Sequence, residues 1–233
     1  MTKERTYAVI IGIFYILAFA SSVIAVILYQ PINNPLDWYH VASNGEVNQV
    51  LWGVLNDVLL LVSAVGTTVF LAPYLAKYDK QLALAYFSFR FMEAVFIAIG
   101  IVSMLVLVSL SQHFNSGFID HSDLLISSGY AWQAVHRWIM ILGPNLMLGI
   151  NTSLYSYLLL KTELVPKRLA QFGLVTAIMV FVAGILDMFG IIEPWSTTKG
   201  LISLPVGIYE MSLAIYLIVK GFKPNALITI TKN

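Results

Sequence analysis

The sequence predicts an all-α fold, a polytopic membrane helix bundle of about six transmembrane helices with both termini in the cytoplasm. The first observation behind this prediction is composition. Hydrophobic residues make up 59% of the chain and charged residues 11%, and the mean hydropathy is +0.82. Soluble domains are about 45–50% apolar and about 25% charged. The second observation is the length of the apolar blocks, and the third is the distribution of lysine and arginine.

The apolar residues form blocks of roughly 20 residues or more, the length that crosses about 30 Å of hydrocarbon. Because lipid offers the backbone no hydrogen-bond partner, each block is expected to be a helix. The first block follows a basic start and contains Ala18-Phe19-Ala20, as a cleaved signal peptide would, but it stays apolar to Leu28 and is expected to span. In chain order the blocks are Tyr7 to Tyr29, Val50 to Ala76, Gln81 to Ser111, Ala131 to Leu160, Leu169 to Gly190 and Gly200 to Val219.

Lysine and arginine orient these helices, because short cytoplasmic loops hold an excess of both. The loops on one side contain Lys199 alone. The other side carries Lys3, Arg5, Lys77, Lys80, Lys161, Lys167, Arg168, Lys220, Lys223 and Lys232. Both termini are therefore expected in the cytoplasm, with the chain in the inner membrane of a cell. Aromatic residues that anchor helices at the membrane surface are expected near the outer face, at Trp38, Tyr39, Tyr130, Trp132 and Trp195.

The connecting segments contain no separate soluble module. The two longer outer loops, residues 30–49 and 112–130, hold turn residues such as Pro31, Asn33 and Gly117 and are expected to be irregular connectors. We therefore expect one transmembrane domain, residues 1–224, followed by a short cytoplasmic tail, residues 225–233.

Ionisable residues inside the apolar blocks are the main pointers to function, because each costs roughly 2.5–3.5 kcal/mol at a helix centre and is expected to face the bundle interior. No catalytic residue and no metal ligand is assigned. The candidate ligand-binding residues are Asp57, Arg90, Glu93, His136, Arg137, Asp187 and Glu210.

Helix spacing places these candidates in one patch. Arg90 and Glu93 share a helix face and lie roughly 14 and 18 Å from the cytoplasmic end of their block, with Glu210 at a similar depth. The other four lie in about the outer third of their helices. The patch is therefore expected to extend from the midplane toward the outer side, with the uncharged first helix at the periphery.

The charges of this patch do not balance, since four carboxylates face two arginines and one histidine. Either a carboxyl group is protonated, or a cation or cationic ligand is bound, or water enters from outside. The alternative is a structural network that only fixes helix packing, with Arg90 paired to Glu93 or Glu210 and Arg137 paired to Asp57 or Asp187.

Proline lies within the predicted fourth and sixth helices, close to the candidate residues. Pro144, within Gly143-Pro144-Asn145, removes a backbone donor and displaces the carbonyl four residues back, so a kink and a freed carbonyl are expected near the midplane. Pro205 precedes Glu210 by five residues. Such prolines form hinges or ligand-facing bends, and they also occur in ordinary transmembrane helices.

Several functional classes lack the residues that they need. The chain has no cysteine, which excludes thiolate chemistry. Its net charge of +1 gives no basis for binding nucleic acid. The blocks contain no lysine for a retinal Schiff base and only His136 for haem, and no cofactor is predicted. An outer-loop set is interpreted as an acidic, solvated loop rather than a zinc site: His113, Asp120, His121 and Asp123.

Four stretches, in order and spacing, resemble the bacterial membrane protein family called domain of unknown function 4386. They are Ala85 to Ala94 with its Arg-x-x-Glu, Leu142-Gly143-Pro144, Leu164 to Leu169, and Pro205 to Pro224 with Lys220-Gly221-Phe222. The resemblance covers nearly the whole chain and implies a six-helix bacterial inner-membrane protein. It implies no activity and no catalytic residues.

Three functions remain open from the sequence. The first is binding of a small ligand or ion, as in a transporter, and the second is a non-catalytic membrane partner or sensor whose charges fix helix packing. The third is an intramembrane lipid-modifying enzyme that uses His136, Asp57 or Glu93 as acid and base, but no nucleophile or metal set supports it. The partner that the sequence itself implies is the lipid bilayer.

Overall fold

The structure, a computed structural model, describes residues 2–34, 37–116, 122–193 and 196–224. Throughout this described part the regular structure is helical, which confirms the predicted fold class. Each predicted block corresponds to a helix or to a run of consecutive helices. The elements are α1 Lys3–Leu28, α2 Gln30–Asn33, η1 Trp38–His40, α3 Val47–Leu75, α4 Lys80–Ser116, α5 Ser122–Ile141, η2 Leu142–Met147, α6 Leu148–Thr162, α7 Lys167–Met188 and α8 Thr197–Val219.

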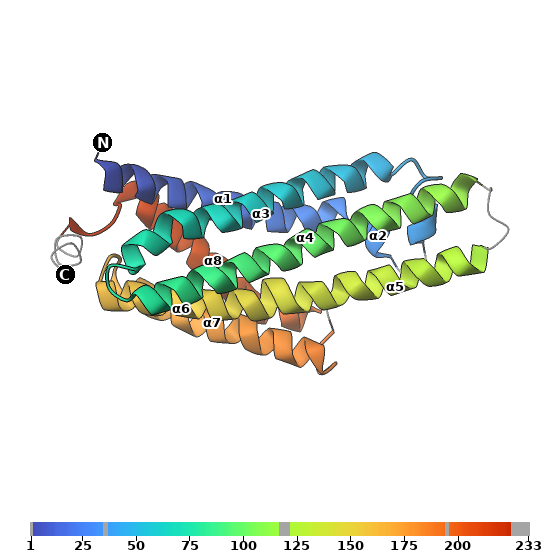
Figure 1. Ribbon diagram of the computed structural model, residues 1–233. Helices are drawn as coiled ribbons and strands as arrows, with labels where there is room; N and C mark the ends of the chain where they lie inside the picture. Colours follow the sequence, from blue (N-terminus) through green and yellow to red (C-terminus); the bar gives the residue numbers. More distant parts are fainter. Residues whose placement is uncertain (1, 35–36, 117–121, 194–195, 225–233) are drawn as a thin grey trace.

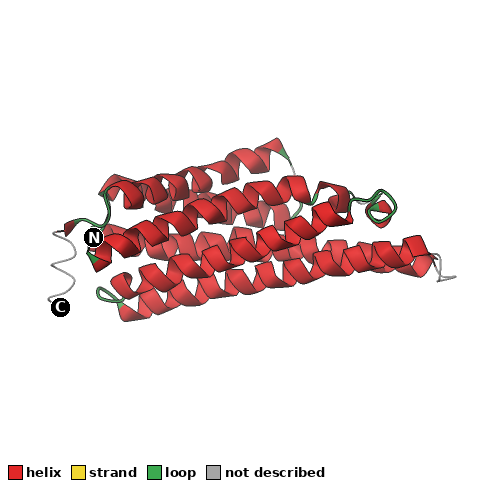
Figure 2. Cartoon of the chain, turned by 90° about the horizontal axis from the view of Figure 1, so that it is seen from above, coloured by secondary structure: helices red, strands yellow, loops and turns green. Residues whose placement is uncertain are grey.

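The long helices lie side by side in an elongated bundle, with both chain ends at the same end of it (Figure 1, Figure 2). α1 packs against α3 and α8, and α4 packs against α3, α5 and α6. Arg5 joins the two ends of the chain, because its guanidinium donates to the carbonyls of Leu217, at 2.9 Å, and of Ile218. An even number of passes, as the sequence predicts, returns the chain to the side on which it began.

Five helices are long and apolar enough to cross a membrane, namely α1, α3, α4, α7 and α8. Large apolar side chains face outward on these helices, among them Ile27, Trp52 and Leu84, each more than 60% exposed. Water would not tolerate so much exposed hydrocarbon, whereas lipid does. The chain is therefore a membrane protein.

α5, η2 and α6 follow one another end to end along the bundle, in the place of the predicted fourth helix (Figure 1). η2 is a π-helical segment of six residues centred on Pro144. Pro144 has no N–H for the carbonyl of Met140, and the side chain of Asn145 donates to that carbonyl instead, at 2.7 Å. The predicted interruption with a freed carbonyl is thus present, and the next residue in the chain supplies the missing donor.

The outer connectors contain more helix than the sequence predicted. α4 continues to Ser116 and α5 begins at Ser122, so the expected irregular loop over residues 112–130 is wrong for most of its length. The reason is tertiary, because η1 packs between these helix ends. Ser111 donates to the carbonyl of Tyr39 at 3.0 Å and accepts from the N–H of Ala42 at 2.9 Å.

Trp38 also differs from expectation. It was predicted to anchor the chain at the membrane surface, yet it is fully buried and packs against Gly129 of α5, where a Cβ atom would overlap the indole ring. Residues Asp120, His121, Trp195 and Lys232, and the predicted tail 225–233, lie outside the described residues.

Candidate functional site

Arg90 and Glu93 form the ion pair at the centre of the bundle. They lie three residues apart on α4, and Nη1 of Arg90 is 2.9 Å from Oε2 of Glu93. Both side chains are buried, with 3% and 5% of their surface exposed. The sequence predicted that the two residues share a helix face and left Glu93 and Glu210 open as partners of Arg90, and the structure pairs Arg90 with Glu93.

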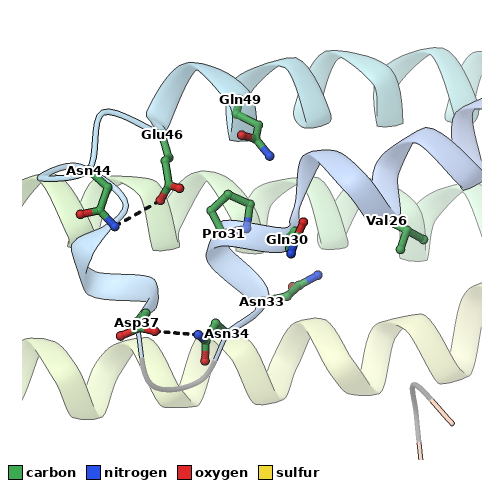
Figure 3. Close-up of a pocket in the computed structure, with 9 residues that line it drawn as sticks. All are labelled: Val26, Gln30, Pro31, Asn33, Asn34, Asp37, Asn44, Glu46 and Gln49. Atoms are coloured by element: carbon green, nitrogen blue, oxygen red, sulfur yellow. Dashed lines mark hydrogen bonds between the residues drawn. The ribbon is translucent and has the colours of Figure 1, made fainter.

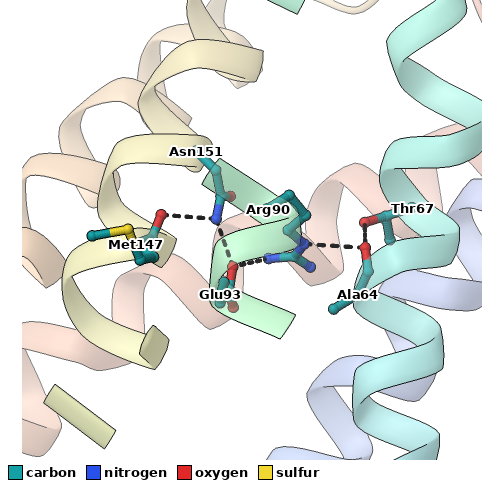
Figure 4. Close-up of polar contacts among 6 residues, drawn as sticks. All are labelled: Ala64, Thr67, Arg90, Glu93, Met147 and Asn151. Atoms are coloured by element: carbon teal, nitrogen blue, oxygen red, sulfur yellow. Dashed lines mark hydrogen bonds and ion pairs between the residues drawn. The ribbon is translucent and has the colours of Figure 1, made fainter. Parts of the chain in front are cut away.

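Two neighbouring helices complete this ion pair (Figure 4). From α6, Nδ2 of Asn151 donates to Oε2 of Glu93 at 2.5 Å and to the carbonyl of Met147 at 2.8 Å. From α3, the carbonyl of Ala64 accepts from Nε of Arg90 at 3.2 Å and from Thr67 at 2.7 Å. Each charged group is therefore hydrogen-bonded to its partner and to one further helix, as burial of a charge requires.

Glu210 lies beside this network without joining it. Its charge interacts with Arg90 and Glu93, and with the hydroxyls of Tyr15, Tyr155 and Tyr209. Glu210 is 8% exposed, and its Oε1 is buried with no hydrogen-bond partner among the described residues. Arg90, the cation nearest to it in this network, is already paired with Glu93.

Four fully buried tyrosines lie beside Arg90 and Glu210, each from a different helix: Tyr15 of α1, Tyr86 of α4, Tyr155 of α6 and Tyr209 of α8. Their rings pack on one another, with centroid separations of 6.0 Å for Tyr15 and Tyr155, 5.5 Å for Tyr86 and Tyr155, and 6.0 Å for Tyr155 and Tyr209. The hydroxyl of Tyr209 pairs with Ser156 at 2.9 Å. We call Arg90, Glu93, Asn151, Glu210 and these tyrosines the central cluster.

Several polar atoms of the central cluster lack a well-formed hydrogen bond within the described part of the chain. They are the hydroxyls of Tyr15, Tyr86 and Tyr155, Oδ1 of Asn151 and Oε1 of Glu210. Buried polar groups in proteins are almost always satisfied by protein, water or ligand. The hydroxyl of Tyr86 lies near those of Thr68 and Tyr15, and the hydroxyl of Tyr155 lies near that of Tyr15.

Asp57 and His136 form a second group, nearer the other end of the bundle. Tyr29 donates to Oδ2 of Asp57 at 2.9 Å, and its ring meets the ring of His136 edge-on at 6.3 Å. Nδ1 of His136 lies 3.1 Å from the hydroxyl of Ser103, which also donates to the carbonyl of Gly100 at 2.6 Å. The single hydroxyl proton of Ser103 is used in the bond to the Gly100 carbonyl. With that proton used, Nδ1 of His136 is the donor in its contact with Ser103.

Asp187 is the centre of a third group. Nζ of Lys199 is 2.5 Å from Oδ2, whereas Nη2 of Arg137 is 3.7 Å from Oδ1, which is too far for a hydrogen bond. The side chain of Lys199 is 15% exposed and that of Arg137 is 52% exposed. Lys199 is therefore the main partner of Asp187, and Arg137 is a peripheral one.

The seven candidate residues thus occupy three groups rather than one connected network in the described structure. Arg90, Glu93 and Glu210 are together, Asp57 and His136 share Tyr29, and Asp187 has Arg137 nearby. Sequence reasoning missed Asn151, the tyrosines and Lys199. The sequence did contain a signal that Lys199 belongs to the last helix. Ser196 is a typical N-cap residue, and in the structure it caps α8 by accepting from the N–H of Lys199 at 3.2 Å.

No group of three or more acidic or histidine side chains suited to a metal is found among the described residues. Within the predicted outer-loop set, Nδ1 of His113 donates to the carbonyl of Ser109, 2.7 Å away on its own helix. Asp120 and His121 are among the residues that the structure does not describe.

The sequence profile of a family described as "Domain of unknown function (DUF4386)" matches residues 10–221. The chain belongs to this family. The match runs from within α1 to Gly221, two residues after α8, so it covers all the residues of the central cluster. No curated protein and no solved structure matches the chain. Membership in the DUF4386 family agrees with the predicted resemblance and assigns no activity.

Proposed function

We propose that this DUF4386 protein binds a small cation or cationic ligand in the central cluster, as a transporter does. The observation that carries the proposal is Glu210, a buried carboxylate whose Oε1 has no hydrogen-bond partner within the described residues. A buried charge of this kind is costly unless something neutralises it.

Counting charge within the central cluster supports this proposal. Arg90 carries one positive charge, and its Nη1 and Nε are engaged by Glu93 and by the carbonyl of Ala64. Glu93 therefore balances Arg90, and an ionised Glu210 gives the cluster a net charge of −1 in a site of low dielectric constant. A monovalent cation or a singly charged ammonium group would restore neutrality.

The position of the cluster suits passage across the membrane. Counting 1.5 Å per residue from the helix ends, its side chains lie roughly 9 to 20 Å from the end of the bundle that carries the termini. This range includes the middle of a hydrocarbon layer about 30 Å thick. The π-helical segment η2 lies one turn from Asn151, and irregular helix at such depth is typical of sites that bind ions.

Orientation and location are part of the same proposal. The end at which α1 begins and α8 ends carries Lys3, Arg5, Lys80, Lys167 and Lys220. Because positive charge is retained in the cytoplasm, we place both termini there, in the inner membrane of a bacterial cell.

A second candidate function is a non-catalytic partner or sensor in which the charges only fix packing. The observation that favours it is the bonding of Arg90, Glu93 and Asn151, in which one hydrogen bond links α4 to α3 and another links α6 to α4. Glu210 distinguishes the two functions, because a purely structural network gains nothing from an unpaired carboxylate.

Thermal unfolding of the purified protein in detergent tests the proposal. Sodium, potassium, ammonium and small organic ammonium chlorides are compared at constant ionic strength, with bulky N-methylglucamine as the reference cation. One of them is expected to raise the melting temperature saturably, since a ligand at 100 times its Kd stabilises by about 2.7 kcal/mol. The shift should vanish in Glu210→Gln and persist in Glu193→Gln, which alters an exposed carboxylate.

The competing result is equally specific. If no cation shifts the wild-type melting temperature, and Glu210→Gln is more stable than the wild type at neutral pH, the cluster is a structural network. If Glu210→Gln responds to the cation as the wild type does, the binding site lies elsewhere.

A further inference from the structure

A separate cavity of about 630 Å³ opens at the end of the bundle away from the termini (Figure 3). Its walls come from the end of α1, from α2, from the segment after it and from the start of α3. The volume lies within the range of small-molecule binding sites. None of its lining residues belongs to the central cluster, so the two sites are independent.

The lining is polar and acidic. It contains two carboxylates and a group of carboxamides, and no lysine, arginine or histidine is among the described residues that line it. Four of the carboxamides are Gln30, Asn33, Asn44 and Gln49, and the carboxylates are Asp37 and Glu46. An anion alone would meet two negative charges here and be repelled. The cavity is therefore suited to a ligand that presents a positive charge together with hydrogen-bond acceptors.

The hydrogen bonds of the cavity leave capacity for such a ligand. Asn34 donates to Oδ2 of Asp37 at 2.7 Å, and Asn44 donates to Oε2 of Glu46 at a long 3.4 Å. The second oxygen of each carboxylate has no hydrogen bond within the described residues that line the cavity. A primary ammonium group has three donors and can serve such acceptors.

An apolar strip leads directly into the cavity. Val23, Ile24, Val26 and Ile27 of α1 are each 44–63% exposed, and Val26 also lines the cavity. This strip belongs to a membrane-spanning helix and so faces acyl chains. A ligand that follows it is amphipathic, with a hydrocarbon tail along α1 and a polar head among the carboxamides.

We propose that this cavity binds the head group of an ethanolamine phospholipid. One of the two carboxylates, Asp37 or Glu46, receives the primary ammonium group, and the amide N–H groups of Gln30 and Asn33 donate to the phosphate oxygens. A choline head group has no N–H to donate to the carboxylates, and a glycerol head group brings negative charge without a compensating cation.

Binding is measured by native mass spectrometry and by thermal unfolding in detergent, with ethanolamine, choline and glycerol phospholipids of the same acyl chains. The ethanolamine lipid is expected to bind about tenfold more tightly than the other two, the effect of one charge-assisted hydrogen-bonded contact. The preference should disappear in the Asp37→Asn/Glu46→Gln variant and weaken in Gln30→Leu. It should persist in Asp123→Asn, whose side chain is exposed and not part of the cavity.

Each other outcome overturns the proposal in a defined way. Equal binding of choline and ethanolamine lipids would show that the ammonium N–H groups are not recognised. Equal protection by soluble phosphoethanolamine would show that the ligand is a free molecule and that the strip on α1 contributes nothing. An unchanged preference in the Asp37→Asn/Glu46→Gln variant would place the lipid elsewhere. Glu210→Gln should keep the lipid preference, so this result does not depend on cation binding in the central cluster.

Discussion

Asn151 and Arg90, from different helices, both donate to a single oxygen, Oε2 of Glu93, at 2.5 and 2.9 Å. The two donors approach from α6 and from α4 itself, so the carboxylate fixes the distance between these helices. Asn151 is fully buried, and its contact with Glu93 spans 58 positions of the sequence. One amide group therefore couples an ion pair within a helix to the packing of the bundle.

The first prediction concerns this amide. Asn151→Leu removes a donor from the buried Glu93 carboxylate and from the carbonyl of Met147, so it should lower the free energy of unfolding by about 1–3 kcal/mol. The measurement is unfolding in mixed detergent and dodecyl sulfate. Ser153→Ala on the same helix is the control, because among the described residues Ser153 bonds to the carbonyl of Gly149 alone, and its effect should be small. Equal effects of both substitutions would mean that the bond to Glu93 adds no stability.

The second prediction concerns the π-helical segment. Asn145→Ala should lower stability by about 1 kcal/mol, because it leaves the carbonyl of Met140 without its side-chain donor. In the Pro144→Ala background a backbone N–H is restored, and the same substitution should then cost less. A double-mutant cycle by thermal unfolding measures this coupling. Additive effects would show that Asn145 and Pro144 act independently.

The third prediction ranks the two cations near Asp187. Lys199→Met leaves the buried carboxylate of Asp187 with Arg137 as its remaining cationic neighbour among the described residues, at 3.7 Å and too far for a hydrogen bond. The substitution should lower the free energy of unfolding by about 3–5 kcal/mol. Arg137→Met removes a half-exposed, distant partner and should cost about 0–1 kcal/mol. Unfolding in mixed detergent gives both values. Adding Asp187→Asn to Lys199→Met should recover part of the loss, and failure to do so would mean that Lys199 acts through packing alone.

Much of the architecture could be predicted because membrane helices are dictated by local composition. The apolar blocks that define α1, α3, α4, α7 and α8 are continuous in the sequence, and lipid forces each of them to be helical. The shared helix face of Arg90 and Glu93 was equally local, although the sequence left Glu210 open as an alternative partner of Arg90. The helical ends of α4 and α5 were missed because their support is η1, a segment about 70 residues away that contacts them through Ser111 and Trp38.

The central cluster shows the same division. The sequence by itself determined that carboxylates and an arginine lie within apolar helices, and therefore that they face inward, because lipid penalises exposed charge. The tertiary structure alone decided which groups meet. It brought Asn151 and the tyrosines of four helices next to Arg90, Glu93 and Glu210. It also paired Asp187 with Lys199 more closely than with Arg137. These pairings between helices depend on how each helix is rotated and packed. Rotation and packing are set by contacts between residues distant in sequence, and local hydropathy does not reveal them.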